Sequence, residues 1–310
     1  MVQRGTEPVT DEAIEVSDEL FAHLPNGLDL CYQTFGDPKN PTILLIMGLG
    51  GPMTWWTNEF CLMLADRGFH VVRYDNRDTG RSTKLRHHRV SRKNVVAAFI
   101  GRGTAPYGLE DMADDVIGLL DHLNIDAAHL VGVSMGGMIS QVLAVEYPDR
   151  VLSLTSIMSS PGRRKVGWIH PRIVPTMLAS VGRTRTEFAE NSVKNGKAIA
   201  SPAFPTDDHL AYVQALETYD RGWIGSGVLR HMLAVLTQAD RTERLQAVTV
   251  PTWVIHGTND QLVNKSGGRA TADAITDARY QEIAGLGHDL PAQLYETFVE
   301  SITANIARTN

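Results

Sequence analysis

The stretch from His129 to Ala144, HLVGVSMGGMISQVLA, decides the expected fold and holds the first candidate for chemistry. It begins with an apolar run typical of a buried strand, and the residues after Ser134 have the apolar spacing of a helix. Gly132 to Gly136 fit the pattern G-x-S-x-G at the junction between the two. A serine on such a sharp turn exposes its Oγ, and small neighbours let the backbone pack closely. We therefore predict that Ser134 is a nucleophile.

Short β-branched runs alternate with longer helical segments along most of the chain. This alternation is typical of an α/β protein with a mostly parallel sheet flanked by helices. The expected strands cover residues 28–35, 42–47, 70–74, 128–133, 152–157, 252–256 and 279–283. The expected helices cover residues 56–67, 109–123, 135–147, 266–275 and 292–306.

The region from Ser159 to about Arg241 breaks this alternation, because it has amphipathic segments and Pro and Gly breaks but no strand candidate. We interpret residues 159–241 as a helical cap inserted into a core of residues 1–158 and 242–310. The large apolar residues of the cap either line a substrate pocket or form the cap's own packed core. We expect packing for most of them, because inserted helices must bury one face. They are Trp168, Met177, Phe188, Phe204, Tyr219, Trp223 and Met232.

A serine hydroxyl needs a base to remove its proton. Of the eleven histidines, His288 alone follows Asp260 in the chain. His288 lies in the turn AGLGHDLP before the last expected helix, and Asp260 lies in GTNDQLV after the expected strand 252–256. Ser134, Asp260 and His288 thus each follow a separate strand. We predict that His288 is the general base and that Asp260 orients its imidazole.

A tetrahedral intermediate needs two preorganised N–H donors for its oxyanion. We expect these to be the backbone N–H groups of Met135 and of Leu49, in the sequence MGLGG of residues 47–51. Gly48 and Gly50 would let this loop approach the substrate. The alternative is that these glycines only form a turn.

Composition excludes several other classes of protein. A net charge of -6 with 21% charged residues gives no basic footprint for nucleic acid. The two cysteines, Cys31 and Cys61, lack the spacing of a zinc site or a disulfide framework. The first twenty residues are too polar for a secretory signal, and no apolar run approaches the length of a membrane span. We expect a cytoplasmic protein that uses neither a metal nor an organic cofactor; the sequence gives no indication of its oligomeric state.

A basic segment from Leu85 to Tyr107 surrounds the apolar patch VVAAFI. One interpretation is a solvated helix with one buried face, which is what such charged runs usually form. The other is a basic amphipathic helix near the mouth of the site, with weak contact to a membrane surface. The sequence leaves both open.

The G-x-S-x-G motif, the late Asp and His turns and residues 74–82, YDNRDTGRS, together resemble the α/β-hydrolase superfamily over nearly the whole chain. The resemblance implies an eight-stranded, mostly parallel sheet with a helical cap, and it makes Asp75, Arg77 and Ser82 scaffold residues. MGLGG in place of the commoner HGxGG, together with RYDNRDTGRS, is similar to the aclacinomycin methylesterase group and to actinobacterial lipase and esterase-like proteins. Met47 stands where that family usually has a histidine, so no side chain at this position is expected to order the loop by hydrogen bonding.

These residues predict a serine hydrolase of the esterase or lipase type. Its substrate would be a carboxylic ester or thioester of a hydrophobic small molecule or lipid, cleaved through an acyl-enzyme on Ser134. A serine at position 134 excludes relatives of this fold that use an aspartate nucleophile. A perhydrolase, a lactonase, a carbon–carbon bond hydrolase and a non-catalytic ligand receptor remain as alternatives.

Overall fold

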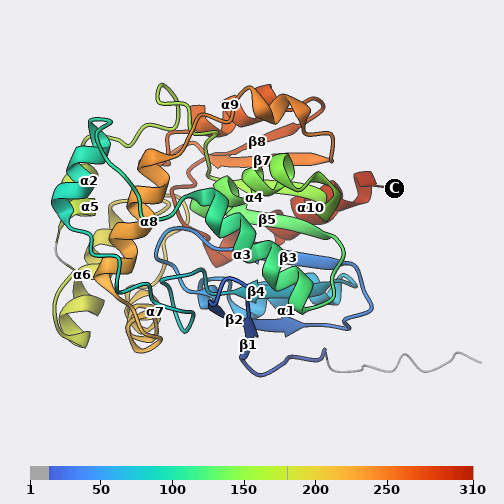
Figure 1. Cartoon of the computed structure of the whole chain (residues 1–310), viewed down its shortest axis with the longest axis horizontal. Helices are drawn as coiled ribbons and strands as arrows, with labels where there is room; N and C mark the ends of the chain where they lie inside the picture. The colour runs from blue at the N-terminus through green and yellow to red at the C-terminus, as the bar shows by residue number, and fades with distance from the viewer. Residues whose placement is uncertain (1–13, 180, 310) are drawn as a thin grey trace, which may run out of the picture.

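An eight-stranded sheet organises the protein, as seen in a computed structural model that describes residues 14–179 and 181–309 (Figure 1). The strands lie in the order β1-β2-β4-β3-β5-β6-β7-β8. β2 pairs antiparallel with β1 and β4, and all other neighbours pair parallel. The strands are β1 (Leu20–His23), β2 (Asp29–Phe35), β3 (Thr42–Ile46), β4 (His70–Tyr74), β5 (Ala128–Val133), β6 (Val151–Ile157), β7 (Thr252–Gly257) and β8 (Arg279–Ile283). The predicted mostly parallel sheet of eight strands is confirmed.

Helices cover both faces of the sheet (Figure 1). Along β3, Leu44 and Ile46 belong to the apolar cluster under α3 (Leu109–His122) and α4 (Met135–Glu146). Ile43 and Leu45 belong to the cluster under α1 (Asn58–Asp66) and α10 (Tyr295–Ile306). Because both faces are buried, β3, β4 and β5 are apolar along most of their length. α9 (Ser266–Ala274) is a further flanking helix.

Four helices lie between β6 and β7, at the end of the sheet where the parallel strands terminate (Figure 1). They are α5 (Val174–Leu178), α6 (Arg185–Lys197), α7 (Asp208–Asp220) and α8 (Gly225–Thr237). The described residues of this insertion contain no strand, as expected. Phe188, Tyr219 and Trp223 pack on one another, and Met232 packs with α2 (Arg92–Phe99). These four apolar residues therefore form packed cores, whereas Trp168 is exposed.

Several boundaries differ from the expected ones. β1 was not predicted, because only Ala22 of its four residues is buried and the alternation is too weak to recognise. The helix expected from residue 56 begins at Asn58, since Thr57 Oγ1 accepts the Phe60 N–H and caps it. The helix expected at 292–306 starts as a 3₁₀ turn, Ala292–Leu294. Other 3₁₀ turns are Met53–Trp55, Pro148–Arg150, Arg244–Ala247 and Ala307–Thr309.

The basic segment forms a helix only over α2, whose Val95 and Ala98 are buried against α8. The prediction about a secretory signal falls largely on residues 1–13, which lie outside the described residues. Among the helices that the structure describes, none is long and apolar enough to cross a membrane.

Candidate active site

Ser134 occupies a strained turn between β5 and α4, with φ 56° and ψ -120°. A left-handed backbone is costly for a residue with a side chain, so it persists only where surrounding packing imposes it. Two glycines make that packing feasible. A Cβ at Gly132 would lie 2.3 Å from the Gly136 carbonyl oxygen, and one at Gly136 would lie 2.0 Å from the Ile46 oxygen. The glycines of G-x-S-x-G are therefore required by contact between α4, β5 and β3.

The structure brings the three predicted triad residues together. His288 Nε2 lies 2.9 Å from Ser134 Oγ, and His288 Nδ1 lies 2.7 Å from Asp260 Oδ2. The side chains of Asp260 and His288 are 0% and 8% exposed. Residues 126 positions apart at the ends of β5 and β7 thus meet because these strands are nearly adjacent and parallel. An imidazole held at both nitrogens can accept a proton from the serine while its cation is stabilised by the carboxylate.

The surroundings of Asp260 favour the ionised form of its carboxyl group despite its burial. Burial by itself raises the pKa of this carboxyl, but the neighbouring His288 and hydrogen bonds from His256 and His288 offset that effect and hold the pKa below its usual value. In addition, Asp260 Oδ1 accepts the N–H groups of Leu262 and Val263 at 2.9 and 2.8 Å. These bonds fix the carboxylate while Oδ2 faces the imidazole.

The loop that carries His288 is held by the segment after α6. The His288 N–H donates to the Ile199 carbonyl at 2.7 Å, and the Gly287 N–H donates to Ser201 Oγ at 2.8 Å. Ser201 Oγ also donates to Asp289. Residues of the inserted region therefore position the candidate base. Sequence reasoning did not find Ser201, because a lone serine in a loop carries no recognisable pattern.

The predicted oxyanion donors lie beside Ser134. Met135 is the first residue of α4, where an N–H has no acceptor within the helix. A Cβ at Gly48 would lie 3.1 Å from Ser134 Cβ and 3.7 Å from Ser134 Oγ, so the loop of residues 47–51 passes directly over the serine. Within the described part of the chain, the N–H groups of Leu49 and Met135 have no protein acceptor. Both are thus available to a substrate oxygen.

Comparisons with known proteins identify the family of the chain. A model of the alpha/beta hydrolase fold family matches residues 41–292. The chain belongs to the α/β-hydrolase family. Rhodomycin D methylesterase of Streptomyces peucetius is 29% identical over 290 residues, covering 87% of this chain and 92% of that protein. A Pantoea ananatis protein with the provisional name carbamate hydrolase is 30% identical over 267 residues, covering 83% of this chain and 85% of that protein.

The enol-lactonase of Burkholderia xenovorans has the same fold, with a TM-score of 0.72 and 24% identity over 93% of this α/β-hydrolase and 100% of the lactonase. The resemblance to the superfamily stated from the motifs is confirmed by the family match and by the methylesterase relatives.

The loop over Ser134 in this α/β-hydrolase is ordered from outside the loop. Met47 is packed in the core, and its carbonyl accepts the side-chain N–H of Asn76 at 3.0 Å. His231 of α8 accepts the Gly50 N–H on Nδ1 at 3.1 Å and lies 2.7 Å from the Arg77 carbonyl through Nε2. Nδ1 must therefore be unprotonated, while Nε2 carries the proton. Burial lowers the pKa of His231 to about 4, which keeps it in this form. No sequence pattern indicates His231, because its partners are backbone groups of two distant loops.

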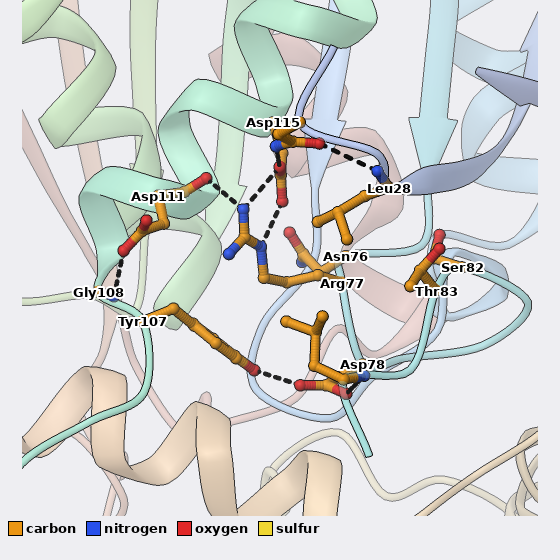
Figure 2. Close-up of polar contacts among 12 residues, drawn as sticks. Leu28, Asn76, Arg77, Asp78, Ser82, Thr83, Tyr107, Gly108, Asp111 and Asp115 are labelled. Atoms are coloured by element: carbon orange, nitrogen blue, oxygen red, sulfur yellow. Dashed lines mark hydrogen bonds and ion pairs between the residues drawn. The ribbon is translucent and has the colours of Figure 1, made fainter. Parts of the chain in front are cut away.

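The turn after β4 supports the same region, as the family resemblance implies for Asp75, Arg77 and Ser82. The Arg77 guanidinium pairs with Asp115 of α3, and the Tyr107 hydroxyl donates to Asp78 (Figure 2). Arg230 of α8 binds the same Asp78 with two nitrogens, at 2.6 and 2.7 Å. This buried ion pair attaches the inserted helices to the core one residue before His231.

Three further scaffold contacts complete this turn. Asp75 accepts the Met53 N–H and pairs with Arg221 at 2.7 Å, and Ser82 Oγ accepts the Cys31 N–H.

Cys31 and Cys61 are both free and buried. The described residues contain no group of three or more His, Cys, Asp or Glu placed to hold a metal ion.

Proposed function

We propose that this α/β-hydrolase is a serine hydrolase that cleaves carboxylic esters through an acyl-enzyme on Ser134. The observation that supports this most strongly is the continuous hydrogen-bonded series Asp260–His288–Ser134, at 2.7 and 2.9 Å. Methylesterases among the relatives favour a carboxylic ester as the substrate class.

In the acylation step, Ser134 Oγ forms a bond to the ester carbonyl carbon while His288 Nε2 takes the serine proton. The carbonyl π electrons move onto oxygen, where the N–H groups of Leu49 and Met135 stabilise the charge. When the intermediate collapses, the bond to the alcohol oxygen breaks and His288 returns its proton to that oxygen. Asp260 holds the imidazole in place and stabilises its cationic form throughout.

In the deacylation step, His288 removes a proton from water as the water oxygen attacks the acyl carbon. The second tetrahedral intermediate is stabilised by the same two N–H groups. It releases the acid when the bond to Ser134 Oγ breaks and His288 protonates that oxygen. The cycle balances with one water consumed, and no cofactor takes part.

We also propose that residues 159–241 form a cap on a core of residues 1–158 and 242–310, and that this cap selects the substrate. Supporting this division, α5 to α8 follow β6 without an intervening strand among the described residues. We place hydrophobic small-molecule esters first among substrates, methyl esters above all, and thioesters and lipid esters second, because all of these use the same machinery.

Hydrolysis of p-nitrophenyl esters from acetyl to palmitoyl tests the proposal. The parent protein is expected to turn over part of this series, and Ser134→Ala is expected to lower kcat by at least about 10⁴-fold, because the nucleophile is removed while binding persists. A fluorophosphonate probe is expected to label the parent protein and not the variant.

Ser301→Ala is the matched control, since this buried serine of α10 bonds Gln281 and the Thr297 carbonyl, away from the candidate triad, and its loss is expected to leave kcat unchanged. If the folded parent protein hydrolyses no ester and resists the probe, the ester proposal fails. Activity on a lactone, a carbamate or a carbon–carbon bond would then identify an alternative use of the triad. Saturable ligand binding without turnover would indicate a receptor.

A further inference from the structure

The charges of this chain are segregated. Residues 79–109 and 159–186 carry 13 of its 29 Lys and Arg residues and none of its 35 Asp and Glu residues. The rest of the chain therefore holds 16 basic against 35 acidic side chains. The net charge of -6 is therefore the sum of a strongly basic part and a more strongly acidic remainder.

Ten of these basic side chains are exposed and form what we call the basic face. Among the residues that the structure describes, no carboxylate oxygen lies within 4.0 Å of a side-chain nitrogen of any of the ten, and Arg183 alone has a carboxylate, that of Glu187, bound to its backbone N–H. They are Arg86, Arg89, Arg92, Lys93, Arg102, Arg163, Arg164, Lys165, Arg172 and Arg183. Charges of one sign that lack local partners produce a field that extends into solvent.

Contacts between the two segments place this face on one side of the molecule. The Arg164 guanidinium lies against Gly101, and Arg92 Nη2 donates to the Ala179 carbonyl at 3.5 Å. In Figure 1, α2 and α5 lie side by side at the outer end of the molecule, away from the edge where the parallel strands begin. The basic face is therefore formed by α2 together with the first part of the inserted region.

Apolar side chains emerge within this face. Val96 and Ile100 are 49% and 66% exposed, and they follow Arg92 at intervals of four residues along one side of α2. The opposite side of α2 is buried against α8 through Val95 and Ala98. Exposed aliphatic side chains between Arg and Lys residues are a composition that inserts into a lipid headgroup region.

We propose that the basic face docks the protein on a bilayer that contains anionic lipid. The Arg and Lys side chains contact the headgroups, while Val96 and Ile100 enter the boundary of the acyl chains. The acidic remainder of the chain is repelled by the same surface, which fixes the orientation. Docking thus turns the inserted region toward the lipid. This region binds the loop that carries His288 through Ile199 and Ser201. The proposal does not depend on which ester, if any, the site hydrolyses.

Co-sedimentation with vesicles tests the proposal. The full chain is expected to bind vesicles of phosphatidylcholine mixed with phosphatidylglycerol, and not vesicles of phosphatidylcholine alone. Binding is expected to weaken as salt is added, because screening shortens the range of the field. Arg92→Glu with Arg164→Glu is expected to weaken binding by at least about 30-fold, since each basic residue near an anionic surface contributes roughly fivefold. Val96→Ser with Ile100→Ser is expected to weaken binding without changing its dependence on salt.

Lys39→Glu with Arg279→Glu is the matched control. This variant changes the net charge by the same amount. Both residues lie at the N-terminal ends of parallel strands, however, at the end of the sheet opposite to the basic face. This variant is expected to bind as the parent protein does, and soluble glycerol phosphate is expected not to compete.

Equal binding by the two charge-reversed variants would overturn the proposal. So would failure to bind anionic vesicles, or capture of an acidic polypeptide or nucleic acid in preference to them. Circular dichroism of each variant establishes that the fold is retained.

Discussion

At the scale of single residues, the candidate site depends on hydrogen bonds that fix protonation as well as position. Asp260 Oδ2 requires a proton on His288 Nδ1, which leaves Nε2 free to accept from Ser134. His231 has the reverse arrangement, with Nδ1 as the acceptor. Both assignments follow from what the partner atoms can donate or accept.

Substitution of His231 tests whether it positions the loop over Ser134. His231→Asn retains an acceptor near Nδ1 for the Gly50 N–H, whereas His231→Gln retains a donor near Nε2 for the Arg77 carbonyl. We expect Asn to keep more activity than Gln, with kcat of the Gln variant reduced by about 10 to 100-fold and KM little changed, because a displaced oxyanion donor acts on the transition state. Kinetics with one p-nitrophenyl ester measure this. Equal kcat values at equal melting temperatures would assign His231 a structural role only.

At the scale of elements, α8 is the link between the inserted region and the core. It contributes the buried Arg230–Asp78 ion pair and, at the next residue, the contact to Gly50. Arg230→Met leaves Asp78 as a buried charge without its main partner, and we expect a loss of unfolding free energy of about 3–5 kcal/mol. Urea denaturation measures it.

The compensating variant is Arg230→Met with Asp78→Asn. Asn removes the charge, tolerates the positive φ of 66° at position 78 and still accepts from Tyr107. Most of the lost stability is expected to return. If the double variant is as unstable as the single one, packing of the Arg230 side chain and not the unpaired charge accounts for the loss.

At the scale of the whole molecule, buried histidines make stability depend on pH. Burial lowers the pKa of His129 and of His231 from 6.5 to about 4. The folded state thus binds fewer protons than the unfolded state between these pH values, so this stability is complete above pH 6.5 and is lost as pH falls toward 4. Each group contributes on the order of 3 kcal/mol over that range.

His129→Gln is expected to reduce the loss of stability between pH 7 and pH 4 by about that amount, even if the variant is less stable at neutral pH. His129 lies on β5 at its start and contacts Ser153, away from the candidate site. Urea denaturation across the pH range measures the slope for the parent and the variant. Parallel slopes would show that other groups control the acid sensitivity.

The strands and helices of the core and the three residues of the candidate triad could be predicted from the sequence without coordinates. Strand periodicity, the glycines around Ser134 and the order of Asp260 and His288 are local or ordinal signals, so they can be read without coordinates. The same holds for the loop at Leu49, whose glycines indicate close backbone approach. β1 could not be predicted in this way, because an exposed edge strand lacks an apolar pattern.

The residues that support the site could be identified only from the folded structure. Ser201 and His231 act on loops 86 and 181 residues away, through backbone N–H groups that exist at every non-proline residue. The sequence does not indicate which side chain accepts a given backbone N–H. The pairs are established only when α8 and the segment after α6 pack on the core. The basic face likewise arises because folding places two acid-free segments side by side, which makes one charged surface from two separate runs.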